Sequence, residues 1–92
     1  MFAAQETTEV HLLCEASVMK AVIDKFGPDV RTKEIGTDRF SAKVRVCVTP
    51  TFFRWVFGWN GRIRIERPKE VKEKYRLLLG EELRLYNKDA SP

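Results

Sequence analysis

The chain has 92 residues, of which 43% are hydrophobic and 33% are charged, and its net charge is +4. This length corresponds to about one domain and excludes a multi-domain enzyme. Because the apolar fraction is large enough to bury a core, the composition excludes a disordered or membrane-embedded chain. The excess of cations fits an anionic partner, and it also fits an ordinary soluble domain, so the placement of the cations matters more than their sum.

The two cysteines, Cys14 and Cys47, form neither a disulfide framework nor a zinc site. Both lie in apolar, strand-like runs, where cysteine acts as a small hydrophobic residue. No stretch approaches the roughly 20 apolar residues of a membrane span. The first nine residues lack the basic and hydrophobic regions of a signal peptide. We therefore expect a cytoplasmic protein with no membrane contact.

The first half of the chain predicts the order strand, helix, strand, strand. Apolar and polar residues alternate over residues 7–14, which predicts a half-buried strand, and apolar residues recur at helical spacing over residues 15–26. Residues 30–35 form a weaker strand pattern. The alternation is clearest over residues 40–48, which predicts a strand after a turn.

The second half predicts helix, strand, helix. Thr49-Pro50 is typical of a helix start, with a hydroxyl cap followed by proline, and it precedes a short helix over residues 51–57. Residues 62–66 alternate as a fourth strand. A last helix is expected over residues 68–86, where Gly80 costs about 1 kcal/mol relative to alanine and leaves open a break or kink.

The order β-α-β-β-α-β-α predicts an α+β fold of the ferredoxin-like, split βαβ class with an added C-terminal helix. Right-handed crossovers place the first two helices on one face of a four-stranded antiparallel sheet. The last helix either finishes covering the sheet or packs outward. We expect a lead-in arm over residues 1–6, a single domain over residues 7–86 and a frayed tail over residues 87–92.

No catalytic, metal or cofactor site is expected. His11 is the only histidine, and it stands on the polar face of a strand, where a surface role is far more common than general-base catalysis. No nucleophile and base can be assembled around it, and no glycine-rich phosphate loop follows a strand. We expect a protein that is not an enzyme.

Cations concentrate on one face of the predicted sheet. Strand alternation places Lys43 and Arg45 on one strand and Arg62 and Arg64 on another, all pointing away from the helices. We expect these two strands to be neighbours and the face to bind an anion or nucleic acid, with Arg31 and Lys33 as further contributors from the second strand. The alternative is a solvated face. No aromatic residue stands on it, which excludes the base stacking of an RNA-recognition module.

The segment from Phe52 to Trp59 is rich in aromatic residues, which cannot all share one helix face. Phe52, Trp55, Val56 and Trp59 form one stripe, which is expected to pack on the sheet. Phe53 and Phe57 form a second stripe, which we expect either to be buried by the last helix or to serve as an interface with another domain or subunit.

Several segments carry a resemblance to one known family. They are Glu9-Val10-His11-Leu12-Leu13, Ile23-Asp24-Lys25-Phe26-Gly27, Trp55-Val56, Asn60-Gly61, Arg62-Ile63-Arg64-Ile65 and Pro68-Lys69-Glu70-Val71. In this order they resemble the C-terminal extension, called WCX, of bacterial WYL-domain transcriptional regulators. Residues 1–6 resemble the segment that joins this extension to the WYL domain.

The resemblance implies a ferredoxin-like domain preceded, in a full-length regulator, by a winged-helix DNA-binding domain and a WYL domain. It implies a homodimer and a nucleotide or nucleic-acid-like effector. This sequence has neither the winged helix nor a Trp-Tyr-Leu motif, so no operator binding and no ligand residues of the WYL domain are assigned to it. We expect an accessory domain that contributes to dimerisation and effector sensing. The alternative is a stand-alone small-ligand-binding module without a role in DNA regulation.

Overall fold

The computed structural model describes residues 6–89. The expected lead-in arm, apart from Glu6, and the last three residues of the expected tail lie outside the described residues. The elements in chain order are β1 (Thr8–Glu15), the short 3₁₀ helix η1 (Ala16–Val18), α1 (Met19–Phe26), β2 (Arg31–Ile35), β3 (Arg39–Val46), α2 (Pro50–Phe57), β4 (Ile63–Arg67) and α3 (Lys69–Asp89).

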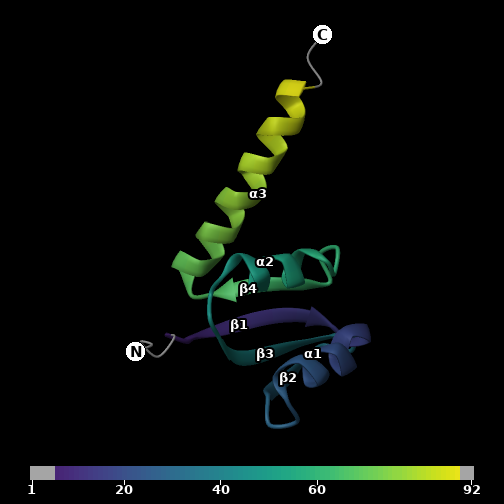
Figure 1. The fold of residues 1–92 in the computed structure, drawn as a ribbon. Coiled ribbons are helices and arrows are strands. Elements are labelled where there is room, and N and C mark those ends of the chain that lie inside the picture. Colours follow the sequence, from purple (N-terminus) through teal and green to yellow (C-terminus); the bar gives the residue numbers. More distant parts are fainter. Residues whose placement is uncertain (1–5, 90–92) are drawn as a thin grey trace.

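The four strands form one antiparallel sheet with the order β2-β3-β1-β4. Figure 1 shows α1 and α2 on the same face of this sheet. The α+β class with a four-stranded antiparallel sheet is therefore confirmed, and the arrangement is compatible with a ferredoxin-like fold. No helix among residues 6–89 is long and apolar enough to cross a membrane.

The core lies between the sheet and its two covering helices. Alternate residues of β1 and β3 enter it, as the sequence predicts: Val10, Leu12 and Cys14 from β1 and Phe40, Ala42 and Val44 from β3. The helices contribute Val22 from α1 and Phe52 and Val56 from α2. Burial of these apolar side chains is the main stabilising contribution to the fold.

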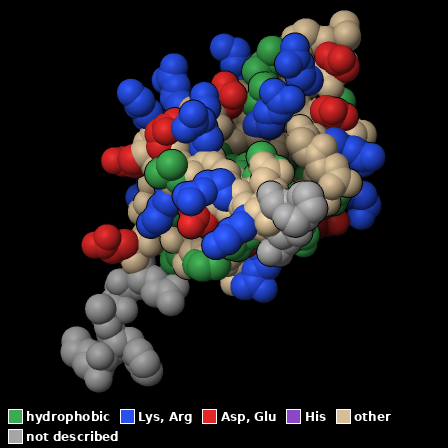
Figure 2. Space-filling model, turned by 90° about the horizontal axis from the view of Figure 1, so that it is seen from above, with side chains coloured by type: hydrophobic (Ala, Val, Ile, Leu, Met, Phe, Trp, Pro, Cys, Tyr) green, Lys and Arg blue, Asp and Glu red, His purple; other side chains and the backbone are tan. Residues whose placement is uncertain are grey.

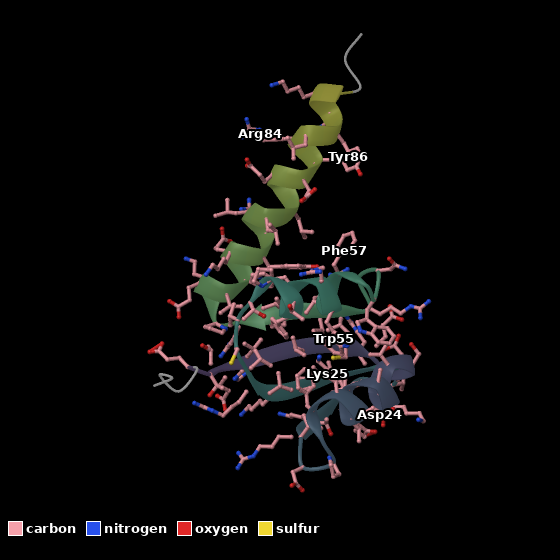
Figure 3. All side chains as sticks on the ribbon, viewed as in Figure 1. Asp24, Lys25, Trp55, Phe57, Arg84 and Tyr86 are labelled. Carbon is pink, nitrogen blue, oxygen red and sulfur yellow. The ribbon has the colours of Figure 1, made fainter. Side chains whose placement is uncertain are left out.

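Helix α2 begins as its sequence indicates. The Thr49 side chain accepts a hydrogen bond from the Phe52 backbone N–H at 3.3 Å, and Pro50 occupies the first helical position. At the other side of the core, the Trp55 ring packs edge-on against Phe26 at 5.3 Å between centroids and lies 5.8 Å from Lys25 Nζ. These contacts join α2 to α1 (Figure 3).

Helix α3 rises from the β4 edge and extends away from the sheet (Figure 1). Its first turns pack on the domain through the buried Val71 and the half-buried Tyr75. The rest carries large exposed apolar residues: Leu77, Leu78, Leu79, Leu83, Leu85 and Tyr86. The helix continues through Gly80 without a break and ends at Asp89, three residues beyond the expected end at Tyr86.

Candidate anion-binding face

The sheet has one face covered by α1 and α2 and one face that no described helix covers, here called the open face. Residues that oppose each other in an antiparallel pair project to the same side of the sheet. The pairing of Leu12 with Ala42, both fully buried, identifies the covered side. The pairs Glu9–Arg45, His11–Lys43, Leu13–Ser41 and Glu15–Arg39 therefore belong to the open face.

The register brings cations from three strands onto the open face. Seven Lys or Arg side chains stand at its paired positions: Arg31, Lys33, Arg39, Lys43, Arg45, Arg64 and Arg67. Only two acidic residues, Glu9 and Glu15, stand at paired positions on this face. The face is therefore strongly cationic, although the whole chain has a net charge of only +4.

Lys43 lies near the middle of the open face, and Arg45 lies near one end of it. Lys43 opposes His11 on β1 and Arg31 on β2. Arg45 opposes Glu9, and its Nε donates to Thr7 Oγ1 at 3.3 Å. The cations are thus spread along β3 rather than gathered at one point.

The expectation that the strand of Lys43 and Arg45 neighbours the strand of Arg64 is wrong. Strand β1 lies between β3 and β4. Leu13 of β1 opposes Ser41 on one side and Arg64 on the other. Because one strand separates the two cationic rows, an anion must span β1 to contact both of them.

Arg62 and Arg64 lie near a third arginine, Arg39, which the sequence analysis did not identify. A hollow of about 100 Å³ is lined by both of them together with Arg39, Glu15 and Leu13. Arg62 precedes β4, and its backbone carbonyl accepts a hydrogen bond from the Glu15 N–H at 2.9 Å, which fixes this end of the strand beside β1. Three arginines thus line one small space, and arginine binds phosphate groups through charge-assisted hydrogen bonds.

These three arginines are available to a ligand. The ion pairs found within residues 6–89 are His11–Glu9, Lys20–Asp24, Arg76–Glu73 and Arg84–Glu81, and none of them includes an arginine of this hollow. Glu15 lines the same hollow, but it stands alone against three cations. The local balance of charge favours an anion.

Of the two cations that the sequence analysis missed on the paired strands, Arg39 and Arg67, only Arg39 could have been found from the sequence. Arg39 precedes the first apolar residue of the clearest alternating run, Phe40, so the same alternation places it with Lys43 and Arg45. Arg67 is different. The register between β1 and β4 shifts between His11 and Leu12, and this shift brings Arg67 opposite His11. No local sequence pattern predicts such an irregularity.

The second aromatic stripe is divided by the structure. Phe53 is buried and packs against Tyr75 of α3 at 5.3 Å between ring centroids, whereas the Phe57 side chain is 61% exposed. A groove of about 600 Å³ separates α2 from α3, with Phe57, Leu83 and Tyr86 among its lining residues. Figure 3 shows Phe57 and Tyr86 on the same side of α3, opposite Arg84. Of the two residues expected at an interface, Phe57 is the one that offers an exposed side chain.

No group of three or more metal-ligating side chains occurs within residues 6–89. Cys14 is buried in the core, and burial raises the pKa of its thiol to about 12, which keeps it protonated and unreactive.

Comparison with protein families gives one match: the model of the WCX domain matches residues 6–81. Neither the curated proteins nor the solved structures gave a significant match. The matched range contains the whole sheet, both covering helices and the part of α3 that packs on the domain.

Proposed function

Because the chain belongs to the WCX domain family, we propose that it is the C-terminal accessory domain of a WYL-type transcriptional regulator. In this role it binds an anionic, nucleotide or nucleic-acid-like effector on the open face and contributes to dimerisation. The partners are the preceding WYL and winged-helix domains of a full-length regulator and a second copy of the chain. The proposal includes a ferredoxin-like fold, which the strand order β2-β3-β1-β4 supports.

One observation carries the proposal: the open face holds seven cationic residues against two acidic ones at its paired positions. A rigid sheet holds these charges at fixed spacing, so several of them can contact successive phosphates of one strand. Such contacts release condensed counterions, which gives affinity without base specificity. The open face has no aromatic residue at these positions, so electrostatic contact with phosphates is the mechanism that it supports.

The exposed apolar residues of α3 that border the groove, among them Leu83 and Tyr86, support the dimerisation part of the proposal. Leu83 is 61% exposed and Tyr86 is 73% exposed, and large exposed apolar patches of this kind mark interaction sites. Together with Phe57 they border the groove between α2 and α3. A second copy that presents the same residues buries this apolar surface symmetrically, as an isologous interface does.

Fluorescence anisotropy with a labelled single-stranded oligonucleotide tests the effector part. We expect a Kd in the range of about 10⁻⁴–10⁻⁶ M for the wild type, as for non-specific electrostatic binding. The double variant Lys43→Glu with Arg45→Glu is expected to bind at least about tenfold more weakly, because each reversal replaces a phosphate contact by a repulsion.

The matched control is Lys74→Glu with Lys88→Glu, which makes the same change in net charge on α3. The proposal requires the control to bind nearly as well as the wild type. An equal loss in both double variants means that net charge alone attracts the oligonucleotide, and this result contradicts a site on the open face.

A further inference from the structure

A second hollow lies at the outer edge of β4, between this strand, the end of α2 and the start of α3. It has a volume of about 400 Å³ and is lined by Phe57, Asn60, Gly61, Ile63, Arg64, Ile65, Lys72, Tyr75, Arg76 and Leu79. We call it the β4 pocket. Its volume falls within the range of about 300–1,000 Å³ that is typical of small-molecule sites.

Helix α3 forms one wall of the β4 pocket with a single face. Lys72, Tyr75, Arg76 and Leu79 have the spacing i, i+3, i+4 and i+7, which places them side by side on a helix. This face combines two cations with an aromatic ring and a leucine. The opposite wall comes from β4, whose Ile63 and Ile65 are buried.

The charges that line the β4 pocket have one sign. Its charged lining residues are Arg64, Lys72 and Arg76, and no Asp or Glu is among them. Arg76 forms an exposed ion pair with Glu73 at 3.2 Å, and such pairs are weak and easily exchanged for a ligand. No ion pair of Arg64 or Lys72 is found in the described part of the chain.

Apart from Asn60 and Gly61, the remaining lining residues are apolar or aromatic. Phe57 offers an exposed ring, and Tyr75 is half-buried, with its ring packed against Phe53. Burial raises the pKa of the Tyr75 hydroxyl above its usual value, so the group stays neutral and adds no negative charge to the pocket. Figure 2 views the molecule from the end to which α3 points, and it shows Lys and Arg side chains beside exposed hydrophobic ones.

We propose that the β4 pocket binds a small aromatic anion, whose phosphate or carboxylate is held by Lys72, Arg64 and Arg76 and whose ring contacts Phe57 and Tyr75. Inorganic phosphate alone leaves the apolar wall unused, and a neutral ring leaves the three cations unused. A ligand with both parts uses the whole lining, and flat rings pack well on aromatic side chains.

The inference rests on the proposed function in one respect: it assigns a small effector to the domain that also holds the cationic open face. Arg64 lines both the β4 pocket and the arginine hollow of the open face. Arg64 is therefore a charged residue that the two sites have in common.

Nuclear magnetic resonance titration of the whole chain with naphthyl phosphate tests the inference, with inorganic phosphate and naphthol in parallel titrations. We expect naphthyl phosphate to bind at least about tenfold more tightly than inorganic phosphate or naphthol. Inorganic phosphate lacks the contacts with the aromatic rings, and naphthol lacks the contacts with the cations. Equal affinity for naphthyl phosphate and inorganic phosphate overturns the inference.

Substitutions at two exposed lysines of α3 locate the site. Lys72→Ala is expected to weaken the binding of naphthyl phosphate about tenfold, as the loss of one charge-assisted contact does. Lys74→Ala is the matched control, since Lys74 is also exposed on α3 but does not line the pocket. Equal effects of the two variants contradict the assignment.

The double variant Lys43→Glu with Arg45→Glu separates this inference from the proposed function. It removes cations of the open face that do not line the β4 pocket, so it is expected to keep its affinity for naphthyl phosphate while losing the oligonucleotide. Loss of naphthyl phosphate binding in this variant assigns the ligand to the open face and overturns the pocket.

Discussion

Alternate residues of β3 point to opposite sides of the sheet, one towards the core and the next towards the open face. Phe40, Ala42 and Val44 are buried, and the residues between and beside them carry the cations and the polar groups. Because the side-chain period of a strand is two residues, a shift of one residue would exchange these faces completely. The buried Phe40 therefore fixes where Arg39 and Lys43 point.

At the start of α2, Thr49 provides a test of local stability. Thr49→Ala removes the side-chain acceptor of the Phe52 N–H and is expected to lower the free energy of unfolding by about 1 kcal/mol. Urea denaturation measures the change. Thr51→Ala is the control, because Thr51 is exposed within α2; an equal loss in this variant contradicts the capping role of Thr49.

The buried thiol of Cys14 predicts a dependence of stability on pH. Burial raises its pKa from 9.0 to about 12 in the folded state, so above pH 9 the unfolded chain releases this proton and the folded chain keeps it. The stability contributed by the neutral thiol is full below pH 9 and is lost as the pH rises towards 12. One pH unit above 9.0 the loss in the free energy of unfolding is about 1 kcal/mol.

Urea denaturation at a series of pH values checks this dependence, with Cys14→Ala as the reference. The wild type should lose more free energy of unfolding than the variant between pH 9 and pH 10. Parallel curves for the two proteins indicate that other groups cause the decline in stability at high pH.

At the scale of the elements, the sequence predicts the kind of each helix and strand well but not their positions in space. Alternation and capping residues place β3 and α2 to within two residues at each end, because these signals are local. The wrong neighbour for β3 has a different origin. Two strands that flank a crossover helix need not be neighbours, because in a split βαβ arrangement a third strand lies between them. Here β1 fills this place, whereas the expectation followed from the order of the strands along the chain alone.

Helix α3 shows the same limit. The sequence leaves open whether this helix covers the sheet or packs outward. In the structure only its first turns pack on the domain, through Val71 and Tyr75. The remaining leucines are exposed. The Phe53 and Phe57 stripe is divided for the same reason, since Tyr75 covers Phe53 and nothing among the described residues covers Phe57 to the same extent.

Two glycines should respond to alanine in opposite directions. Gly80 lies inside α3 with open space where a Cβ would stand, so Gly80→Ala is expected to stabilise this helix by about 0.5–1 kcal/mol. Gly61 has a φ of +86°, which L side chains rarely adopt, so Gly61→Ala is expected to destabilise the protein. Thermal unfolding followed by circular dichroism distinguishes the two; stabilisation by Gly61→Ala contradicts the turn conformation.

Self-association should depend on the side of α3 that faces the groove. Leu83→Ser is expected to lower the apparent mass in sedimentation velocity, because it places a hydroxyl in the proposed apolar interface. Leu77→Ser is the matched control: Leu77 is 65% exposed on the same helix but does not line the groove. A monomeric wild type, or equal effects of both variants, contradicts an interface at this groove.

At the scale of the whole molecule, the fold distributes its charges unevenly. The covered face of the sheet is apolar, the open face is cationic, and the β4 pocket lies at the edge between the open face and α3. The range matched by the WCX family model, residues 6–81, contains the whole sheet and both covering helices. In the proposed function, the open face is the surface that binds the effector.

The salt dependence of oligonucleotide binding tests the central claim most directly. One phosphate contact each from the four cations Lys43, Arg45, Arg62 and Arg64 predicts a slope of log K against log salt concentration of about −3 for a single strand. Arg62→Ala should make this slope less steep by about 0.7. Anisotropy titrations at several salt concentrations measure both slopes. A slope that decreases in magnitude in this variant supports phosphate binding at the arginine hollow, whereas a slope near zero, or the same slope in both proteins, contradicts it.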